Sequence, residues 1–405
     1  MLKRLRLKGF KSFEDQEVDL SALTVLVGAN ASGKSNVLDA IRFLQGVAMD
    51  MSFVDVLRGR WEGGRRTWPG LRGGTTDLVR KGGTKFEIES DWLLGNDTIT
   101  HRIGCEVGEH PLLTHEALFS TGVHPYVFDT EADALKGKKG REGSNIRVAI
   151  KRSGKGNSVT QVLSANRSLL AQVRAQGGVA KEVAAVRDRL TFAMRSALFL
   201  DITPSRMRDY VPEGMDTLGL EGENVSALTY TICKDAEAKQ DLVDWLTELC
   251  APELIDIEFA RTDLGDVMLV LVEDGKRRIP ARSLSDGTLR FLGELIALRT
   301  ATPGSTLLME EIENGLHPTR AHLLVEAMEA ATKARNVQVI ATTHSPMVLN
   351  ALSREALHRA VLVGRPPGSP GTVLKQLGQL PQFDVVCEKR GIDRLLSSGW
   401  LERAL

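Results

Sequence analysis

Residues 28–35, GANASGKS, match the pattern G-x-x-x-x-G-K-[S/T] in full. The segment TVLVG that leads into them is typical of a buried strand, and residues 35–45 after them have helical periodicity. This strand–loop–helix context is the one in which the pattern forms a phosphate-binding loop. Backbone N–H groups and the helix N-terminus would hold the phosphates, Lys34 would reach the β and γ phosphates, and Ser35 could bind Mg²⁺. The expected nucleotide-binding residues are Gly28, Asn30, Ser32, Gly33, Lys34, Ser35 and Asn36.

Two acidic residues follow a second buried strand, in the stretch LLMEE that ends at Glu310 and Glu311. Glu310 would hold Mg²⁺, through water, and Glu311 would act as the general base on the attacking water. A strand with an acidic end explains one glutamate, but explains a pair beside a phosphate loop poorly. A third strand, VQVIATT, ends at His344, which such a sheet would place near the γ-phosphate, although a lone histidine is more often structural.

The stretch LSDGT, residues 284–288, is typical of a helix start, because a serine precedes an Asp-Gly pair and then an apolar helical run. The simple interpretation is a helix cap. Its place in the chain, between the phosphate loop and the acidic pair, also allows a role in nucleotide binding.

Lys34, LSDGT, the Glu310/Glu311 pair and His344, in this order, resemble the Walker A, signature, Walker B and switch-histidine set of ABC-type ATPases. The resemblance implies that ATP is the nucleotide. It also implies that Ser285 and Gly287 act in trans, closing over ATP held by a second copy, so that the protein forms a homodimer around two ATP molecules. The sequence departs from that pattern at Glu310, where aspartate is commoner, and at His317, where transporter-type members have aspartate; no Q-loop glutamine can be assigned.

LKGFKSF and GKSNVLDAIRFLQG resemble the N-terminal head of SMC, RecF and related ATPases. EEIENGLHP, LSDGTLRF and ATTHSP are more similar to RecF/OLD-type ATPases, including the ATPase subunits of phage-defence nucleases. The resemblance is strong over residues 1–46 and 280–350. It implies an α/β fold, an ABC-type ATPase head with a P-loop sheet, an antiparallel β lobe and an inserted helical subdomain.

The order of predicted elements gives three segments. Residues 1–95 would form the first half of the head, 96–254 an inserted β lobe and helical arm, and 255–405 the second half of the head. Alternating apolar segments at 85–94, 98–107, 145–152 and 158–163 predict the antiparallel strands. The Gly/Arg-rich stretch at 57–74 is expected to be a loop.

The composition is that of a globular protein, with 42% hydrophobic and 26% charged residues, and no apolar run approaches a membrane span. Four widely spaced cysteines without a C-x-x-C pair argue against a zinc site and for a reducing compartment, so we expect a cytoplasmic protein without membrane contact.

The net charge is zero, yet residues 136–189 hold thirteen lysines and arginines against three acidic residues. This excess indicates either a solvated loop or a surface for nucleic acid. The candidate contacts for DNA phosphates are Lys136, Lys138, Lys139, Arg141, Arg147, Lys151 and Arg152.

Three functions follow from these patterns. The first is an ATPase acting with DNA in repair or anti-phage defence through a separate effector, a nuclease or toxin. The second is an ATP-gated scaffold of low turnover that holds or silences such a partner. The third, a transporter subunit, is disfavoured by the 251 residues between Lys34 and Ser285. A nuclease centre of its own is not expected, because the residues after ATTHSP lack an acidic D-x-D cluster.

Overall fold

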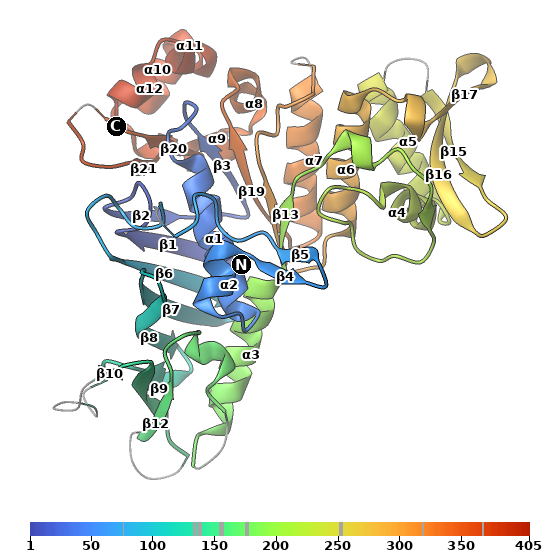
Figure 1. The fold of residues 1–405 in the computed structure, drawn as a ribbon. Coiled ribbons are helices and arrows are strands. Elements are labelled where there is room, and N and C mark those ends of the chain that lie inside the picture. Colours follow the sequence, from blue (N-terminus) through green and yellow to red (C-terminus); the bar gives the residue numbers. More distant parts are fainter. Residues whose placement is uncertain are drawn as a thin grey trace.

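The computed structural model describes residues 1–75, 77–132, 135, 140–153, 158–174, 178–250, 254–317, 320–366 and 368–405. An antiparallel sheet, a mainly parallel sheet and a smaller antiparallel sheet are arranged along the molecule (Figure 1). Within the described residues, none of the helices combines the length and apolar character needed to cross a membrane.

The large antiparallel sheet has the strand order β10-β11-β9-β8-β7-β6-β1-β2, and β12 pairs with β11. Its strands are β1 (Leu2–Lys8), β2 (Asp15–Asp19), β6 (Lys85–Leu94), β7 (Asp97–Glu106), β8 (Leu112–Ser120), β9 (Val123–Asp129), β10 (Arg141–Glu142), β11 (Asn145–Lys151) and β12 (Ser158–Ser164). Strands β6 and β7 flank residue 95 and are hydrogen-bonded neighbours. The division of the chain at residues 95 and 254 stays a prediction.

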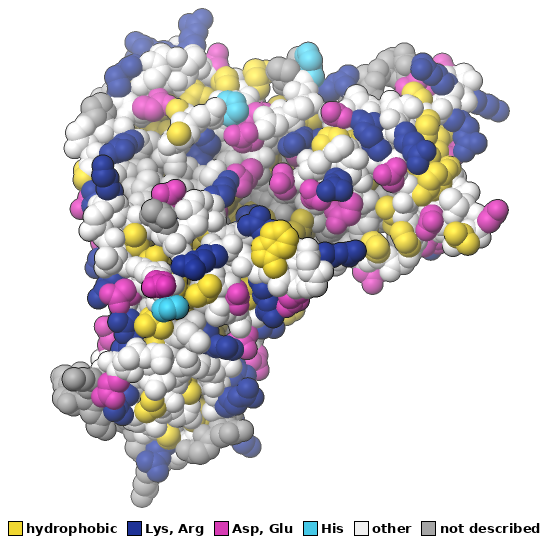
Figure 2. All heavy atoms as spheres, viewed as in Figure 1, with side chains coloured by type: hydrophobic (Ala, Val, Ile, Leu, Met, Phe, Trp, Pro, Cys, Tyr) yellow, Lys and Arg dark blue, Asp and Glu magenta, His cyan; other side chains and the backbone are white. Residues whose placement is uncertain are grey.

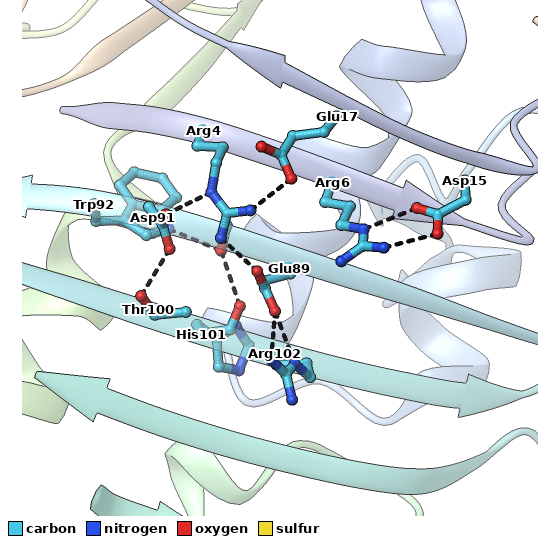
Figure 3. A network of polar contacts seen from close by, with 11 residues as sticks. Arg4, Arg6, Asp15, Glu17, Glu89, Asp91, Trp92, Thr100, His101 and Arg102 are labelled. Carbon is cyan, nitrogen blue, oxygen red and sulfur yellow. Dashed lines mark hydrogen bonds and ion pairs between the residues drawn. The ribbon is translucent and has the colours of Figure 1, made fainter. Parts of the chain in front are cut away.

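Cross-strand ion pairs cover part of this sheet (Figure 3). Arg4 on β1 contacts Glu17 on β2 at 2.7 Å and Asp91 on β6 at 2.6 Å, and Arg6 pairs with Asp15 at 2.8 Å. Arg6 holds the pKa of the Asp15 carboxyl below its ordinary value through this hydrogen bond. Such half-exposed pairs contribute little to stability, but their complementary charges favour this register of β1 against its neighbours.

The parallel sheet has the order β13-β18-β19-β3-β20-β21. Its strands are β3 (Leu23–Val27), β13 (Ala197–Leu200), β18 (Thr306–Met309), β19 (Gln338–Thr343), β20 (Val361–Gly364) and β21 (Val373–Gln376). All pairs are parallel except β20–β21. Strands β3, β18 and β19 are therefore adjacent, and their carboxyl ends meet at one edge.

Helix α1 (Lys34–Ala48) joins the two large sheets, because its apolar face packs in the same core as the antiparallel sheet. Phe43 on α1 is in edge contact with Phe86 on β6, with ring centroids 5.2 Å apart. The other helices of this region are α2 (Phe53–Arg58) and α3 (Lys181–Arg195). Val183, Val186 and Leu190 are buried on α3.

A second core lies beyond the parallel sheet, under helices α6 (Asp286–Thr300) and α7 (Ala321–Ala334). It includes the small sheet of β14 (Val211–Pro212), β15 (Leu254–Arg261), β16 (Asp266–Glu273) and β17 (Arg277–Pro280) with α4 (Val225–Ile232) and α5 (Ala236–Cys250). The short helices α8 (Pro346–Ala351), α9 (Arg354–Arg359), α10 (Phe383–Arg390), α11 (Ile392–Ser397) and α12 (Trp400–Arg403) complete it.

The expectation of a loop over residues 57–74 is wrong for its central part. Strands β4 (Arg60–Glu62) and β5 (Arg65–Trp68) form an antiparallel hairpin there. The Gly63-Gly64 turn allows it, because glycines adopt the positive φ that a two-residue hairpin turn requires.

Candidate functional site

The phosphate loop connects β3 to α1, as the motif predicts. Gly33 has φ +111°, and a Cβ there would lie 3.0 Å from the hydroxyl of Ser12, so this position requires glycine. Asn30 is exposed in the loop, and the buried Ser32 hydroxyl has no hydrogen-bond partner among the described residues. Asn36 donates from Nδ2 to the Ser12 Oγ at 2.9 Å. The Ser32 hydroxyl is thus a polar group that the fold leaves unused, as a site for phosphate would have.

Lys34 is held inside the loop it belongs to. Its Nζ donates to the carbonyl oxygens of Gly28 at 2.6 Å and Ala29 at 2.9 Å, and the residue is 6% exposed. Burial lowers the pKa of the ammonium, and the carboxylates of Glu313 and Glu311 oppose that shift. A phosphate group in the loop would offer this cation a better partner than two neutral carbonyls.

Ser35 and Glu310 meet across the junction of α1 and β18. The Ser35 hydroxyl lies 3.1 Å from Glu310 Oε2, although 275 residues separate them in the chain. A hydroxyl and a carboxylate oxygen are hard donors that suit Mg²⁺, which takes few protein ligands beside phosphate and water. The donor set therefore fits the expected metal.

Arg72, which the sequence did not single out, reaches this pair. Its Nη1 lies 2.8 Å from Glu310 Oε2, and its Nη2 donates to the Ser35 carbonyl at 3.0 Å. Asp39, which is 1% exposed, accepts from Arg72 Nε at 3.1 Å. Hydrogen bonds and charges from Glu310 and Asp39 keep the Arg72 pKa raised despite burial. No spacing signal separates Arg72 from the other arginines of residues 57–74.

Glu311 follows β18 in a left-handed conformation with φ +47°, which residues other than glycine adopt only at a cost. Its N–H donates to Thr342 Oγ1 at 2.9 Å, and its Oε2 accepts from Asn314 Nδ2 at 2.6 Å. Thr342 belongs to the adjacent strand β19, so the two strand ends hold this backbone together. The carboxylate is thereby fixed near the Walker A lysine, whose pKa it influences.

His344 follows β19, and Glu313 contacts both its ring and its backbone N–H. Glu313 Oε1 lies 2.8 Å from the ring Nδ1 and accepts the His344 backbone N–H at 2.7 Å. These contacts leave Nε2 as the ring nitrogen available to a ligand. Burial raises the pKa of Glu294 on α6 to about 8, and the charge of Glu313 adds to this shift. We interpret Glu313 as the residue that positions His344.

Replacing Glu313 by alanine is expected to lower kcat about tenfold to a hundredfold with KM nearly unchanged, because a hydrogen bond to a charged group contributes about 1.5–3 kcal/mol. Glu313→Gln should restore most of the rate, since its amide oxygen can still accept from the His344 backbone and Nδ1–H. The control is Glu329→Ala. It removes a carboxylate on α7 that accepts the Ser353 N–H at 3.1 Å. Equal loss in the glutamine and alanine variants would contradict a positioning role.

Ser285 and Gly287 lie at the start of α6, a helix that Figure 1 draws apart from α1. Ser285 caps the helix by accepting the Thr288 N–H at 3.1 Å. A Cβ at Gly287 would lie 2.3 Å from the Gly315 carbonyl oxygen, so packing within the chain already requires this glycine. In Figure 1, β13 and α7 lie between α1 and α6.

The expected DNA patch is described only in part. Lys136, Lys138 and Lys139 lie outside the described residues. Of the others, Arg141 pairs with Glu106 at 2.6 Å, Arg147 with Glu142 at 3.3 Å, and Lys151 donates to the His124 carbonyl. Arg152 forms an isolated β-bridge with Val179. The patch stays a prediction.

Two family models match the chain. The model described as "AAA domain, putative AbiEii toxin, Type IV TA system" matches residues 131–350, more than half of the chain. The model described as "RecF/RecN/SMC N terminal domain" matches residues 1–54.

Among the similar proteins, some match most of this chain and others match only a short part of it. A Helicobacter pylori protein named ATP/GTP phosphatase is 21% identical over 359 residues, covering 87% of this chain and 88% of that protein. The DNA replication and repair protein RecF of Nostoc punctiforme is 50% identical over 44 residues, 11% of this chain and 12% of RecF. The chromosome partition protein Smc of Halothermothrix orenii is 52% identical over 48 residues, 11% of this chain and 4% of Smc.

A crystal structure of the SmcHead bound to the C-winged helix domain of ScpA has the same fold, with a TM-score of 0.51 and 13% identity over 93% of this chain and 98% of that chain. The expected α/β ATPase head is thereby confirmed. The chain belongs to the AAA-domain family whose model matches residues 131–350, and it is an ABC-type ATPase of the RecF/SMC-like branch.

Proposed function

We propose that this protein is a Mg²⁺-dependent ATPase that forms a homodimer around ATP in the cytoplasm and acts with DNA in repair or anti-phage defence through a separate effector. The observation that carries the proposal is the meeting of Ser35, Glu310, Glu311 and His344 at the edge where β3, β18 and β19 end. This edge is where ligands bind in parallel α/β sheets.

Each residue of the site has a role in this proposal. The loop N–H groups and Lys34 bind the phosphates, and Ser35 and Glu310 would hold Mg²⁺, which would offset the phosphate charge. Glu311 takes the proton from the attacking water, and His344, oriented by Glu313, donates toward the γ-phosphate. The fixed backbone around Glu311 supports the role of base, because its carboxylate needs little reorganisation to act.

The dimer is proposed from the placement of the signature stretch, residues 284–288. Within the described residues, the hydrogen bonds of the Ser285 hydroxyl go to Thr288 alone. Helix α6, which Ser285 caps, is drawn apart from α1, the helix that follows the phosphate loop (Figure 1). A helix N-terminus attracts anions, so a γ-phosphate brought by a second copy suits it.

The role with DNA draws on the relatives, because RecF is a DNA replication and repair protein and Smc a chromosome partition protein. The separate effector is supported by the SmcHead structure, which holds a domain of another protein. Both are properties of those proteins, and we propose them here for this chain.

DNA is expected to raise the ATPase rate severalfold above the basal rate. The physical reason is that Arg72, which contacts Glu310 at 2.8 Å, is itself exposed, so a bound polyanion can draw its guanidinium away from that carboxylate. Phosphate release is measured with and without duplex and single-stranded DNA, with Glu311→Gln as the blank. A rate indifferent to both nucleic acids would favour a scaffold.

That scaffold is the second candidate: an ATP-gated protein of low turnover that holds or silences a toxin or nuclease. The contact between Arg72 and Glu310 favours it, because a guanidinium on a metal-binding carboxylate slows the formation of a metal site. The family description, with its toxin and its type IV toxin–antitoxin system, agrees with this candidate.

A further inference from the structure

The hairpin of β4 and β5, residues 58–68, projects from the head near α1 and α2 (Figure 1). Its two central turn residues, Gly63 and Gly64, have φ of +55° and +78°. A Cβ added at either glycine would find no atom within 4 Å, so the tip is open to solvent. Glycines at an open tip let another backbone approach closely.

The base of the hairpin is fixed. Trp68 is 5% exposed, and its Nε1 donates to the Val56 carbonyl of α2 at 3.0 Å. Leu71, three residues further on, is also 5% exposed. The base of the hairpin is therefore packed against the head, which orients the exposed side chains of the hairpin.

Those exposed side chains are an indole and several guanidinium groups. Trp61 is 65% exposed and lies opposite Arg66 in the register, so both are on one face of the hairpin. Residues 58–68 hold four arginines against one glutamate, and Arg58, Arg60, Arg65 and Arg66 are all exposed. At the place of the hairpin, Figure 2 shows a hydrophobic side chain flanked by Lys and Arg side chains.

An exposed indole beside arginines is suited to binding nucleic acid. Bases stack on aromatic side chains, and arginines pair with the phosphates on either side, which together hold single strands without regard to sequence. A duplex keeps its bases stacked on one another and offers an indole no free face. An acidic protein surface would satisfy the arginines but would leave the indole exposed.

We propose that the hairpin of residues 58–68 binds single-stranded DNA, with an unpaired base on Trp61 and phosphates on its arginines. This rests on the proposed function with DNA and names the form of DNA that is bound. The segment from Trp68 to Arg72 connects the hairpin to the residue that contacts Ser35 and Glu310. A strand bound to the hairpin would therefore lie only a few residues along the chain from the metal site.

The test measures the affinity of the full chain for a fluorescein-labelled oligothymidylate by anisotropy. Trp61→Ala is expected to weaken binding about tenfold, the effect of removing one base stack. Trp61→Phe should retain most of the affinity, and Leu264→Ala, which removes a 91% exposed side chain of the β15–β16 turn, should retain all of it. Arg65→Glu should weaken binding and reduce the log–log salt slope by about 0.7 for each phosphate that the variant no longer neutralises.

Unchanged affinity in Trp61→Ala would overturn the proposal, as would tighter binding of a duplex than of the oligothymidylate. A loss in Arg147→Glu without one in Arg65→Glu would place the DNA at the patch near β11 instead. ATP hydrolysis without DNA, measured on the same samples, separates the two proposals. Its absence in the wild type would count against the ATPase, whereas normal hydrolysis with unchanged Trp61→Ala binding would count against the hairpin alone.

Discussion

Replacing Glu311 by glutamine is expected to lower kcat about 10²–10⁴-fold, the usual contribution of a general base, while ATP binding stays close to wild type. The amide keeps the shape of the carboxylate and can still accept from Asn314, which donates to Glu311 at 2.6 Å, but it cannot take a proton from water. Lys34→Ala should behave differently and weaken ATP binding about tenfold to a hundredfold, because it removes a charged hydrogen-bond donor.

The measurement is single-turnover hydrolysis together with equilibrium binding of a fluorescent ATP analogue. Glu326→Gln, an exposed carboxylate on α7, is the matched control and should leave both unchanged. Hydrolysis at the wild-type rate in Glu311→Gln would show that the base is elsewhere, with Glu310 or Glu313 as the next residues to replace.

Mixing two inactive variants, Lys34→Ala and Ser285→Arg, is expected to restore ATPase activity. In a mixed dimer one composite site carries both changes and the other carries neither. With complete exchange of subunits, half of the dimers are mixed, so independent sites should recover about a quarter of the wild-type rate. The physical reason is that the γ-phosphate charge must be met by fixed donors from both sides, and one phosphate loop covers only one.

Ser285→Arg alone should keep the fold and the first binding of ATP but block closure of the dimer. It also removes a helix cap, which costs about 1 kcal/mol. Ser353→Arg is the matched control, because Ser353 caps α9 in the same way, accepting the Ala356 N–H at 3.3 Å. ATPase activity that is independent of protein concentration in a monomeric sample would contradict the composite site.

The sequence by itself predicted the ABC-type set of motifs and the strands that carry it. The phosphate loop, the acidic pair and the histidine follow strands whose apolar character is local, so β3, β18 and β19 could be predicted one at a time. Strands β6 and β7 were likewise predicted from alternation within a few residues of their bounds. The ABC-type fold followed from the order of these motifs.

Only the tertiary structure decided which side chains meet. Arg72 contacts Glu310 across 238 residues, and Glu313 contacts His344 from the end of a neighbouring strand. Neither contact produces a periodic pattern in the sequence. The sequence also missed β13, which lies in the segment expected to hold the inserted β lobe and helical arm and which pairs with β18 of the parallel sheet. The Gly/Arg-rich stretch was predicted as a loop because its residues have low strand propensity, whereas the Gly63-Gly64 turn and the burial of Trp68 make it a hairpin. Long-range burial and pairing decide such contacts, and local composition does not encode them.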